Sequence, residues 1–163
     1  MSDSVYHTVI HSIGHSSHSE AEFLALLRRH GITLLADVRS IPASRYVPRF
    51  AGRNLRQWLP QNGVSYRWLG DRLGGKPPPE LLPLRAERFQ DGIAELLALG
   101  TEHKVAMMCA ERDPAHCHRA HLVAPGLLAG GAQVLHILPD GGIEDHASLV
   151  LRLAPKQADL FGT

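Results

Sequence analysis

The stretch VAMMCAERDPAHCHRAHL, residues 105 to 122, contains an apolar run that stops at Cys109, then a polar loop, and then a renewed apolar pattern. A short apolar run bounded by a loop is typical of a buried strand, and the spacing after the loop is that of an amphipathic helix. The stretch therefore predicts a strand over 104–109 and a helix over 118–131. We expect a kink at Pro125, because proline removes a hydrogen bond inside a helix.

The same alternation continues along the rest of the chain. Runs of β-branched and aliphatic residues predict strands over 8–14, 32–38, 64–69 and 132–138, and helical periodicity predicts helices over 19–31, 54–63 and 85–100. Five strands alternating with four helices predict an α/β fold, namely a single three-layer domain with a mostly parallel, roughly five-stranded sheet flanked by helices. We place this domain at residues 1–153, with a proline-rich surface loop at 74–83.

Composition excludes several classes of protein. The chain has 163 residues, ordinary apolar content and no visible repeat, which indicates a globular protein and not a solenoid or a disordered chain. No apolar stretch approaches the length of a membrane span, and the N-terminal MSDSVYHTVI lacks the basic head and apolar run of a secretory signal. Two cysteines are too few for a disulfide framework. We therefore expect a cytoplasmic protein without membrane contact, whose thiols are reduced.

The overall charge gives no case for nucleic-acid binding, since the formal net charge is +1. One segment without any acid nevertheless holds five arginines, which are Arg39, Arg45, Arg49, Arg53 and Arg56. This segment is either a surface that faces an anion or a solvated loop.

Polar side chains follow four of the five predicted strands, at the point where each strand ends. They are His15 and Ser16 after the first strand, Asp37, Arg39 and Ser40 after the second, Cys109 and Glu111 after the fourth, and Asp140 after the fifth. The carboxyl ends of parallel strands meet at one edge of a sheet, and ligands bind in the crevice beyond them. The sequence therefore predicts one pocket that is lined by residues from distant segments.

The residue types in this pocket suit an anionic substrate that carries phosphate. Arginine side chains and helix N-terminal amides bind phosphate groups, so the candidate substrate-binding residues are His15, Ser16, Arg39, Arg45 and Arg119. Glu111 or Asp37 is the candidate general base. Cys117 beside His118 has the ingredients of an activated nucleophile, with His118 as an alternative general acid. The candidate catalytic residues are therefore Asp37, Glu111, Cys117 and His118.

Other interpretations of the same residues stay open. Asp37 and Arg39 share a parity along the strand and could pair simply to satisfy their charges. Cys109 ends an apolar run, as a buried small hydrophobic residue does. The donor set Cys109, Cys117 and His118 also suits zinc or iron, although its spacing is not the paired CxxC and HxxxH pattern of structural zinc sites. A disulfide between Cys109 and Cys117, or thiol redox cycling, is a further alternative.

Four segments together are similar to a known family. They are SIGHSSHSEAEFLALLRRHGITLLADVRSIPASR, GVSYRWLGDRLGG, CAERDPAHCHR and VLHI, and they follow one another in this order between residues 8 and 146. The combination of IGHS, DVRSIP and CAE…CHR resembles the domain of unknown function 488 family. The resemblance implies a compact α/β domain in bacterial or archaeal cytoplasm, and it implies no reaction. The shared motifs fall here on Gly14, His15, Ser16, Asp37, Arg39, Pro42, Arg45, Cys109, Glu111, Cys117, His118 and Arg119.

The last residues, 154–163, are expected to form a flexible tail outside the domain. Within it, QADLF (157–161) resembles the short motif by which bacterial DNA polymerases and repair proteins dock onto the sliding clamp. In that motif the glutamine makes hydrogen bonds and the Leu-Phe pair fills an apolar pocket, a binding mode that suits a flexible segment. Chance, or folding of the pair back onto the domain, stays open as an alternative. The candidate partner-binding residues are Gln157, Asp159, Leu160 and Phe161.

Two hypotheses of different classes follow. The first is an enzyme that acts on a phosphate-bearing substrate, either a nucleotide or a DNA-related molecule, in the strand-end pocket, and that its tail recruits to the sliding clamp in replication or repair. The second is a non-catalytic module that holds zinc or iron, or senses redox state, through Cys109, Cys117 and His118.

Overall fold

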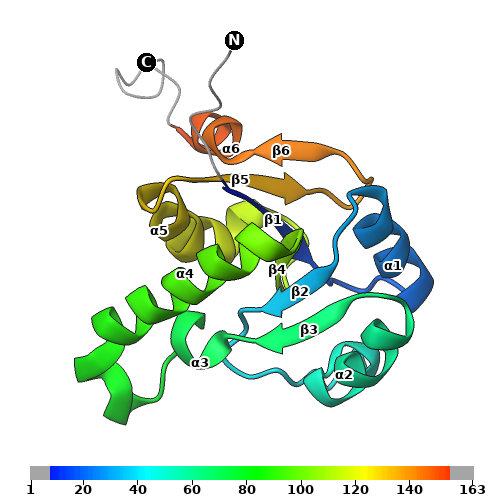
Figure 1. Ribbon diagram of the computed structural model, residues 1–163, viewed down its shortest axis with the longest axis horizontal. Coiled ribbons are helices and arrows are strands. Elements are labelled where there is room, and N and C mark those ends of the chain that lie inside the picture. Colours follow the sequence, from blue (N-terminus) through cyan, green and yellow to red (C-terminus); the bar gives the residue numbers. More distant parts are fainter. Residues whose placement is uncertain (1–7, 155–163) are drawn as a thin grey trace, which may run out of the picture.

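The computed structural model describes residues 8–154, which form one sheet with helices on both faces (Figure 1). The strands in this part of the chain are β1 (Thr8–Gly14), β2 (Leu34–Asp37), β3 (Ser65–Trp68), β4 (Val105–Cys109), β5 (Ala132–Ile137) and β6 (Ile143–Asp145). The α-helices are α1 (Glu20–Arg29), α2 (Gly52–Gln61), α3 (Gly70–Leu73), α4 (Arg85–Glu102), α5 (Ala124–Ala129) and α6 (His146–Leu153).

The strands lie across the sheet in the order β3-β2-β4-β1-β5-β6. All neighbouring pairs are parallel except β5 with β6, which is antiparallel. The predicted α/β fold with a mostly parallel sheet is therefore confirmed. The sheet has one strand more than the roughly five expected, because β6 has only three residues and is too short to show an alternating pattern.

The central strands are covered on both faces, which explains their uninterrupted apolar runs. Every residue of β2 and β4 is buried. Val105 and Met107 pack in the core beneath α3, α4 and α5, whereas Ala106 and Met108 pack in the core beneath α1 and α2. Figure 1 shows these two groups of helices on opposite faces of the sheet. The carboxyl ends of β1, β2 and β4 are thereby held side by side.

Two helix features expected from the sequence, a capping box and an interruption at Pro125, are present in the structure. The capping box of α1 is formed, since Ser19 Oγ accepts from the Glu22 backbone N–H at 3.1 Å, and Glu22 Oε1 accepts from the Ser19 N–H at 3.4 Å. The helix expected over 118–131 is divided into a π-helical turn, Arg119–Val123, and α5. Pro125 follows this turn without a break in the helix, so its missing N–H leaves the helix one hydrogen bond short, as expected. The expected kink is therefore a change of helix type.

Other features lie beyond the predicted elements or outside the described residues. Part of the loop expected at 74–83 forms a 3₁₀-helix, Pro79–Leu84, and α3 and α6 were not expected. None of the described helices is long and apolar enough to cross a membrane. The motif QADLF at 157–161 lies outside the described residues.

One buried histidine in β1 gives the fold a dependence on pH. His11 is 5% exposed, and its Nδ1 has no hydrogen-bond partner among the described residues. Burial, followed by the charges of Lys104 and His30, lowers the pKa of His11 from 6.5 to about 4. Below pH 6.5 the unfolded chain therefore binds a proton at this position that the folded chain does not bind. The contribution of His11 to stability is lost as the pH falls from 6.5 towards 4.

The variant His11→Leu should raise the free energy of unfolding more at pH 5 than at pH 7.5, because leucine has no proton to bind in the unfolded chain. Urea denaturation of both proteins at the two pH values measures the difference. An equal change at both values would show that the imidazole does not titrate on unfolding.

Candidate functional site

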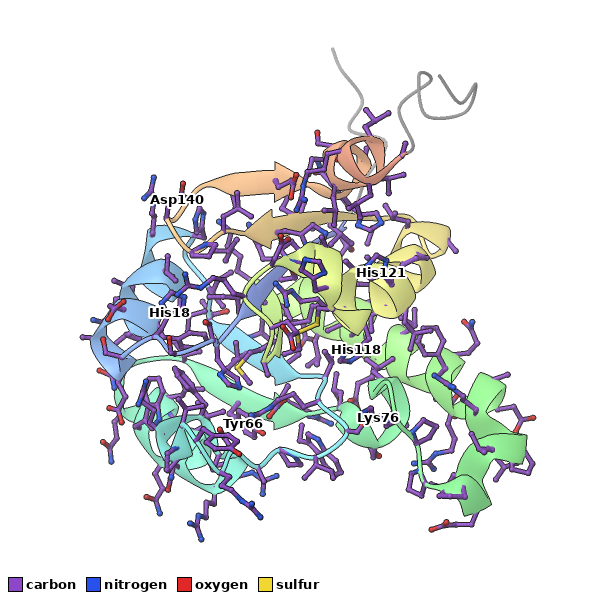
Figure 2. All side chains as sticks on the ribbon, turned by 180° about the vertical axis from the view of Figure 1, so that it is seen from behind. His18, Tyr66, Lys76, His118, His121 and Asp140 are labelled. Carbon is purple, nitrogen blue, oxygen red and sulfur yellow. A yellow bond between two sulfur atoms is a disulfide. The ribbon has the colours of Figure 1, made fainter. Side chains whose placement is uncertain are left out.

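The carboxyl ends of β1, β2 and β4 open onto a cavity of about 560 Å³. It is lined by His15, Arg39, Ser40, Ile41, Ala43, Ser44, Gly75, Lys76, Cys109, Ala110, Glu111, His116, Cys117 and His118. Figure 2 labels two of them, His118 and Lys76, which come from the loop after β4 and the loop after α3. A volume of this order suits a small-molecule ligand.

A close approach of backbones fixes the β1 side of the cavity. A Cβ on Gly14 would lie 1.8 Å from the carbonyl oxygen of Glu111, so only glycine fits at this position. The N–H groups of His15 and Ser16 donate to the carbonyls of Cys109 and Ala110 at 2.9 and 3.0 Å. The loops that follow β1 and β4 are therefore tied together along one wall.

Asp37 holds Arg39 in place at the second wall. The Asp37 carboxylate is fully buried and accepts hydrogen bonds from Arg39 Nε at 2.8 Å and Nη2 at 2.7 Å. It also accepts from Tyr66 Oη at 2.6 Å, and burial together with the Asp37 charge raises the pKa of Tyr66. Because its acceptor sites are occupied and it does not line the cavity, Asp37 has the position of a residue that orients Arg39. Such a position disfavours it as a general base.

The ring of His15 presents one nitrogen to Arg39. It stacks on Phe50 with centroids 4.7 Å apart, and its Nδ1 lies 2.8 Å from the Ser16 carbonyl oxygen. A carbonyl only accepts, so Nδ1 carries the hydrogen and Nε2 carries the lone pair. Nε2 lies 3.4 Å from Arg39 Nη1. Burial lowers the pKa of His15 to about 4, so the ring is neutral near pH 7.

The loop after β4 brings a second cysteine, Cys117, back to the end of that strand. Asp113 caps the 3₁₀-turn Pro114–His116 by accepting from the Ala115 N–H at 2.9 Å. This turn places Cys117 beside Cys109, and the structure joins the two by a disulfide. The finding corrects the expectation of two reduced thiols. A nucleophilic role for Cys117 therefore requires reduction first, since the thiolate is the nucleophile.

His118 is oriented by the neighbouring strand. Its Nε2 lies 2.9 Å from the carbonyl oxygen of Val38 and must donate, which leaves the lone pair on Nδ1. Nδ1 lies 3.8 Å from Cys117 Sγ. Burial is the main cause that lowers the pKa of His118. The possible ligand atoms of Cys109, Cys117 and His118 all lie within 4.8 Å of one another, so the predicted metal-binding residues are together.

Arg119 lies beneath the cavity and is fully buried. Its guanidinium donates to Ser12 Oγ at 3.1 Å, to Cys109 Sγ at 2.7 Å and to the Glu111 carbonyl oxygen at 2.8 Å. No carboxylate among the described residues forms an ion pair with it, and burial lowers the pKa of Arg119 to about 10. Arg119 therefore supplies positive charge to the site, but it cannot contact a substrate in the cavity.

A buried polar chain continues from Arg119 across β1 and β5. Ser12 Oγ is hydrogen-bonded to His136 Nδ1, and His136 Nε2 lies 3.1 Å from His146 Nδ1 at the start of α6. Burial lowers the pKa of His136 to about 3. Sequence patterns gave no sign of this chain, because its members come from three separate elements.

The structure brings together six of the predicted site residues around the cavity: His15, Arg39, Cys109, Glu111, Cys117 and His118. It places the other five residues predicted for this pocket elsewhere. Arg45 is exposed, Ser16 Oγ accepts from Arg112 Nε at 3.3 Å, and Asp37 and Arg119 are buried behind the lining. Asp140 is exposed in the turn between β5 and β6, away from the cavity, because β5 lies beyond β1 in the sheet.

Sequence reasoning placed Ser40 at the pocket but missed three other polar residues of the lining, which are Ser44, Lys76 and His116. The GGK stretch at 74–76 carried a usable signal. A Cβ on Gly74 would lie 2.3 Å from Ser40 Oγ, so glycine permits the close approach that brings Lys76 to the cavity.

The fold and the cavity define an α/β protein whose candidate site lies at the carboxyl edge of a mostly parallel sheet. The family model described as Domain of unknown function DUF488 matches residues 19–81 and 82–124. The chain belongs to this family, as its motifs indicated. No curated protein and no solved structure matches the chain. The family description names no reaction.

The variant Asp37→Asn should lower the free energy of unfolding by about 3–5 kcal/mol, because it leaves the buried Arg39 charge without its partner. Urea denaturation at pH 7.5 measures the loss. Asp91→Asn, at an exposed position of α4, is the matched control and should change stability by less than about 0.5 kcal/mol. Similar small effects of both substitutions would contradict the role given to Asp37.

Proposed function

We propose that the protein is an enzyme that acts on a small phosphate-bearing substrate, of nucleotide or DNA-related type, held in the strand-end cavity. The observation that carries this proposal is the combination, in one cavity, of oriented cationic and hydroxyl donors with a single carboxylate among the described lining residues. Donors of this kind bind phosphate oxygens, and the carboxylate supplies a base.

The charges around the cavity favour an anion. The Arg39 charge is balanced by Asp37 at 2.7 Å, so the excess positive charge comes from Lys76 and the buried Arg119. Glu111 is the acid that opposes them in the lining. Arg39 can still hold a phosphate group in one orientation, because its own guanidinium is fixed by the Asp37 carboxylate and by the Phe50 carbonyl oxygen at 2.7 Å. A fixed guanidinium loses little entropy when it binds a phosphate.

Two serines add hydroxyl donors. Ser40 Oγ accepts from the Lys76 N–H at 2.8 Å, and Ser44 Oγ accepts from the Val47 N–H at 3.0 Å. Each hydroxyl therefore has its own hydrogen left for an acceptor in the cavity. Phosphate oxygens are such acceptors.

Glu111 is the residue that we assign as general base. It is exposed at the cavity, on the loop that is tied to β1. Its carboxylate is thus free to accept a proton from an attacking water or hydroxyl of the substrate. In the disulfide form Cys117 has no thiolate. The general-base chemistry assigned to Glu111 uses none.

Binding of AMP and of inorganic phosphate to the full chain, measured by calorimetry, tests the proposal. Lys76→Met should weaken binding by about tenfold, which corresponds to the loss of one charged hydrogen bond. Lys104→Met is the matched control, since Lys104 precedes the opposite, amino end of β4, and it should leave the affinity unchanged. Absence of binding, or equal effects of the two substitutions, would sink the proposal.

A second candidate is a non-catalytic redox-sensing module, and the Cys109–Cys117 disulfide is the observation that favours it. A redox sensor responds to oxidation of its thiols and needs no phosphate-bearing ligand. The two candidates are therefore separated by the same calorimetry. Binding of AMP that depends on Lys76 supports the enzyme, whereas no binding in either redox state supports the sensor.

We further propose that the tail docks onto the sliding clamp through QADLF, 157–161, with Leu160 and Phe161 as apolar anchors. Docking would bring the cavity to sites of DNA replication or repair. This part of the proposal rests on the sequence motif alone.

The full chain should bind the sliding clamp of its own organism with micromolar affinity, and the double variant Leu160→Ala, Phe161→Ala should lose that binding, because truncating both anchors leaves the apolar pocket unfilled. Surface plasmon resonance measures both affinities. Lys156→Ala, outside the motif, is the control and should bind as the unaltered chain does. Failure of the unaltered chain to bind would remove the clamp from the proposal without touching the cavity.

A further inference from the structure

We propose that the reduced form of the Cys109–Cys117 pair binds one zinc ion together with His118, on the wall of the strand-end cavity. The proposal does not rest on the proposed function, because zinc binding is measured without any substrate. It also assigns a role to the cysteines that the phosphate chemistry leaves unused.

The three donors are already gathered. The two sulfurs and an imidazole nitrogen of His118 lie within 4.8 Å of one another, and these are the atom types that zinc prefers. Sulfurs bound to one tetrahedral zinc at about 2.3 Å lie roughly 3.7 Å apart. The Cα atoms of Cys109 and Cys117 are 7.4 Å apart, which is wider than the usual range for a disulfide. The backbone therefore leaves room for the sulfurs to separate around an ion once the pair is reduced.

His118 is oriented as a metal ligand. Its Nε2 donates to the Val38 carbonyl oxygen at 2.9 Å, so the lone pair is on Nδ1, on the side of Cys117 Sγ. Metal-binding histidines commonly have this arrangement, in which a carbonyl accepts from one ring nitrogen and fixes the other for the ion. The ring needs no change of tautomer to bind.

Arg119 supports the sulfur ligands from behind. Its Nη1 donates to Cys109 Sγ at 2.7 Å from a fully buried position. Two thiolates neutralise the charge of Zn²⁺, and a hydrogen bond to a ligating sulfur is a common outer contact of metal sites. The guanidinium, which has no carboxylate partner among the described residues, would thus face a sulfur that carries negative charge.

The fourth coordination position would open into the cavity. Cys109, Cys117 and His118 all line it, as do Glu111 and His15. Three protein ligands with one open position are typical of catalytic zinc sites, whereas structural sites use four. An ion here would therefore be accessible to a small ligand in the cavity.

Reduction must precede binding. Two molecules of a monothiol RSH donate two electrons and two protons to the disulfide, which gives Cys109–SH, Cys117–SH and RSSR. Zinc then displaces the two thiol protons and binds both thiolates with the neutral His118 ring. The oxidised chain lacks these thiolates, so zinc affinity should depend on the redox state of the pair.

The test measures zinc binding to the full chain in both redox states. One sample is reduced with a monothiol and freed of it without oxygen, and the other is kept oxidised. Competition with a chromogenic zinc chelator should give one tightly bound zinc per reduced chain and none at this site in the oxidised chain. Cobalt added to the reduced chain should give sulfur-to-metal charge-transfer bands. Absence of these bands, or equal zinc binding by both redox forms, would overturn the proposal.

Two histidine variants locate the site. His118→Gln should weaken zinc binding by more than the roughly 10–100-fold that loss of an outer contact costs, because it removes a ligand and leaves both thiols in place. His116→Gln is the matched control, since His116 lines the same cavity outside the cluster, and it should bind zinc normally. Circular dichroism checks that both variants fold. Equal affinities of the two variants would refute the ligand role of His118.

Discussion

The buried ion pair between Asp37 and Arg39 is the interaction on which the candidate site depends. Asp37 accepts from Arg39 and Tyr66, and Arg39 in turn donates to the Phe50 carbonyl. The end of β2 is thereby fastened to β3 and to the chain that leads into α2. Charges buried in this way are stable only with their partners. The pair therefore fixes the wall of the cavity as well as the direction of Arg39 in its lining.

The other walls are fixed by neutral contacts, which leaves the positive charge of Arg119 as the unusual feature. The rings of His15 and His118 are each oriented by a backbone carbonyl. Arg119 has sulfur, hydroxyl and carbonyl partners but no carboxylate among the described residues. A buried cation without an ion-pair partner among the described residues favours anions nearby. Both proposals make use of it: phosphate in the cavity in one, and a sulfur ligand of zinc in the other.

Much of the site could be predicted because parallel strands bring their carboxyl ends to one edge. This rule alone placed His15, Arg39, Glu111 and the loop to His118 around one pocket. The rule could not predict how deeply each side chain is buried. Arg119 has the residue type of a phosphate ligand, yet only the packing shows that it is fully buried. Lys76 reaches the cavity through a contact with Ser40, 36 positions away in the chain, which no local pattern encodes.

We propose that the protein binds its substrate in the strand-end cavity. The most direct measurement is to follow the assigned histidine ring signals by NMR during a titration of the full chain with AMP. We expect saturable shifts at His15, His116 and His118, which line the cavity, and none at His103, at the end of α4. Shifts at His103 alone, or no saturable shift at any of the three lining histidines, would contradict substrate binding in this cavity.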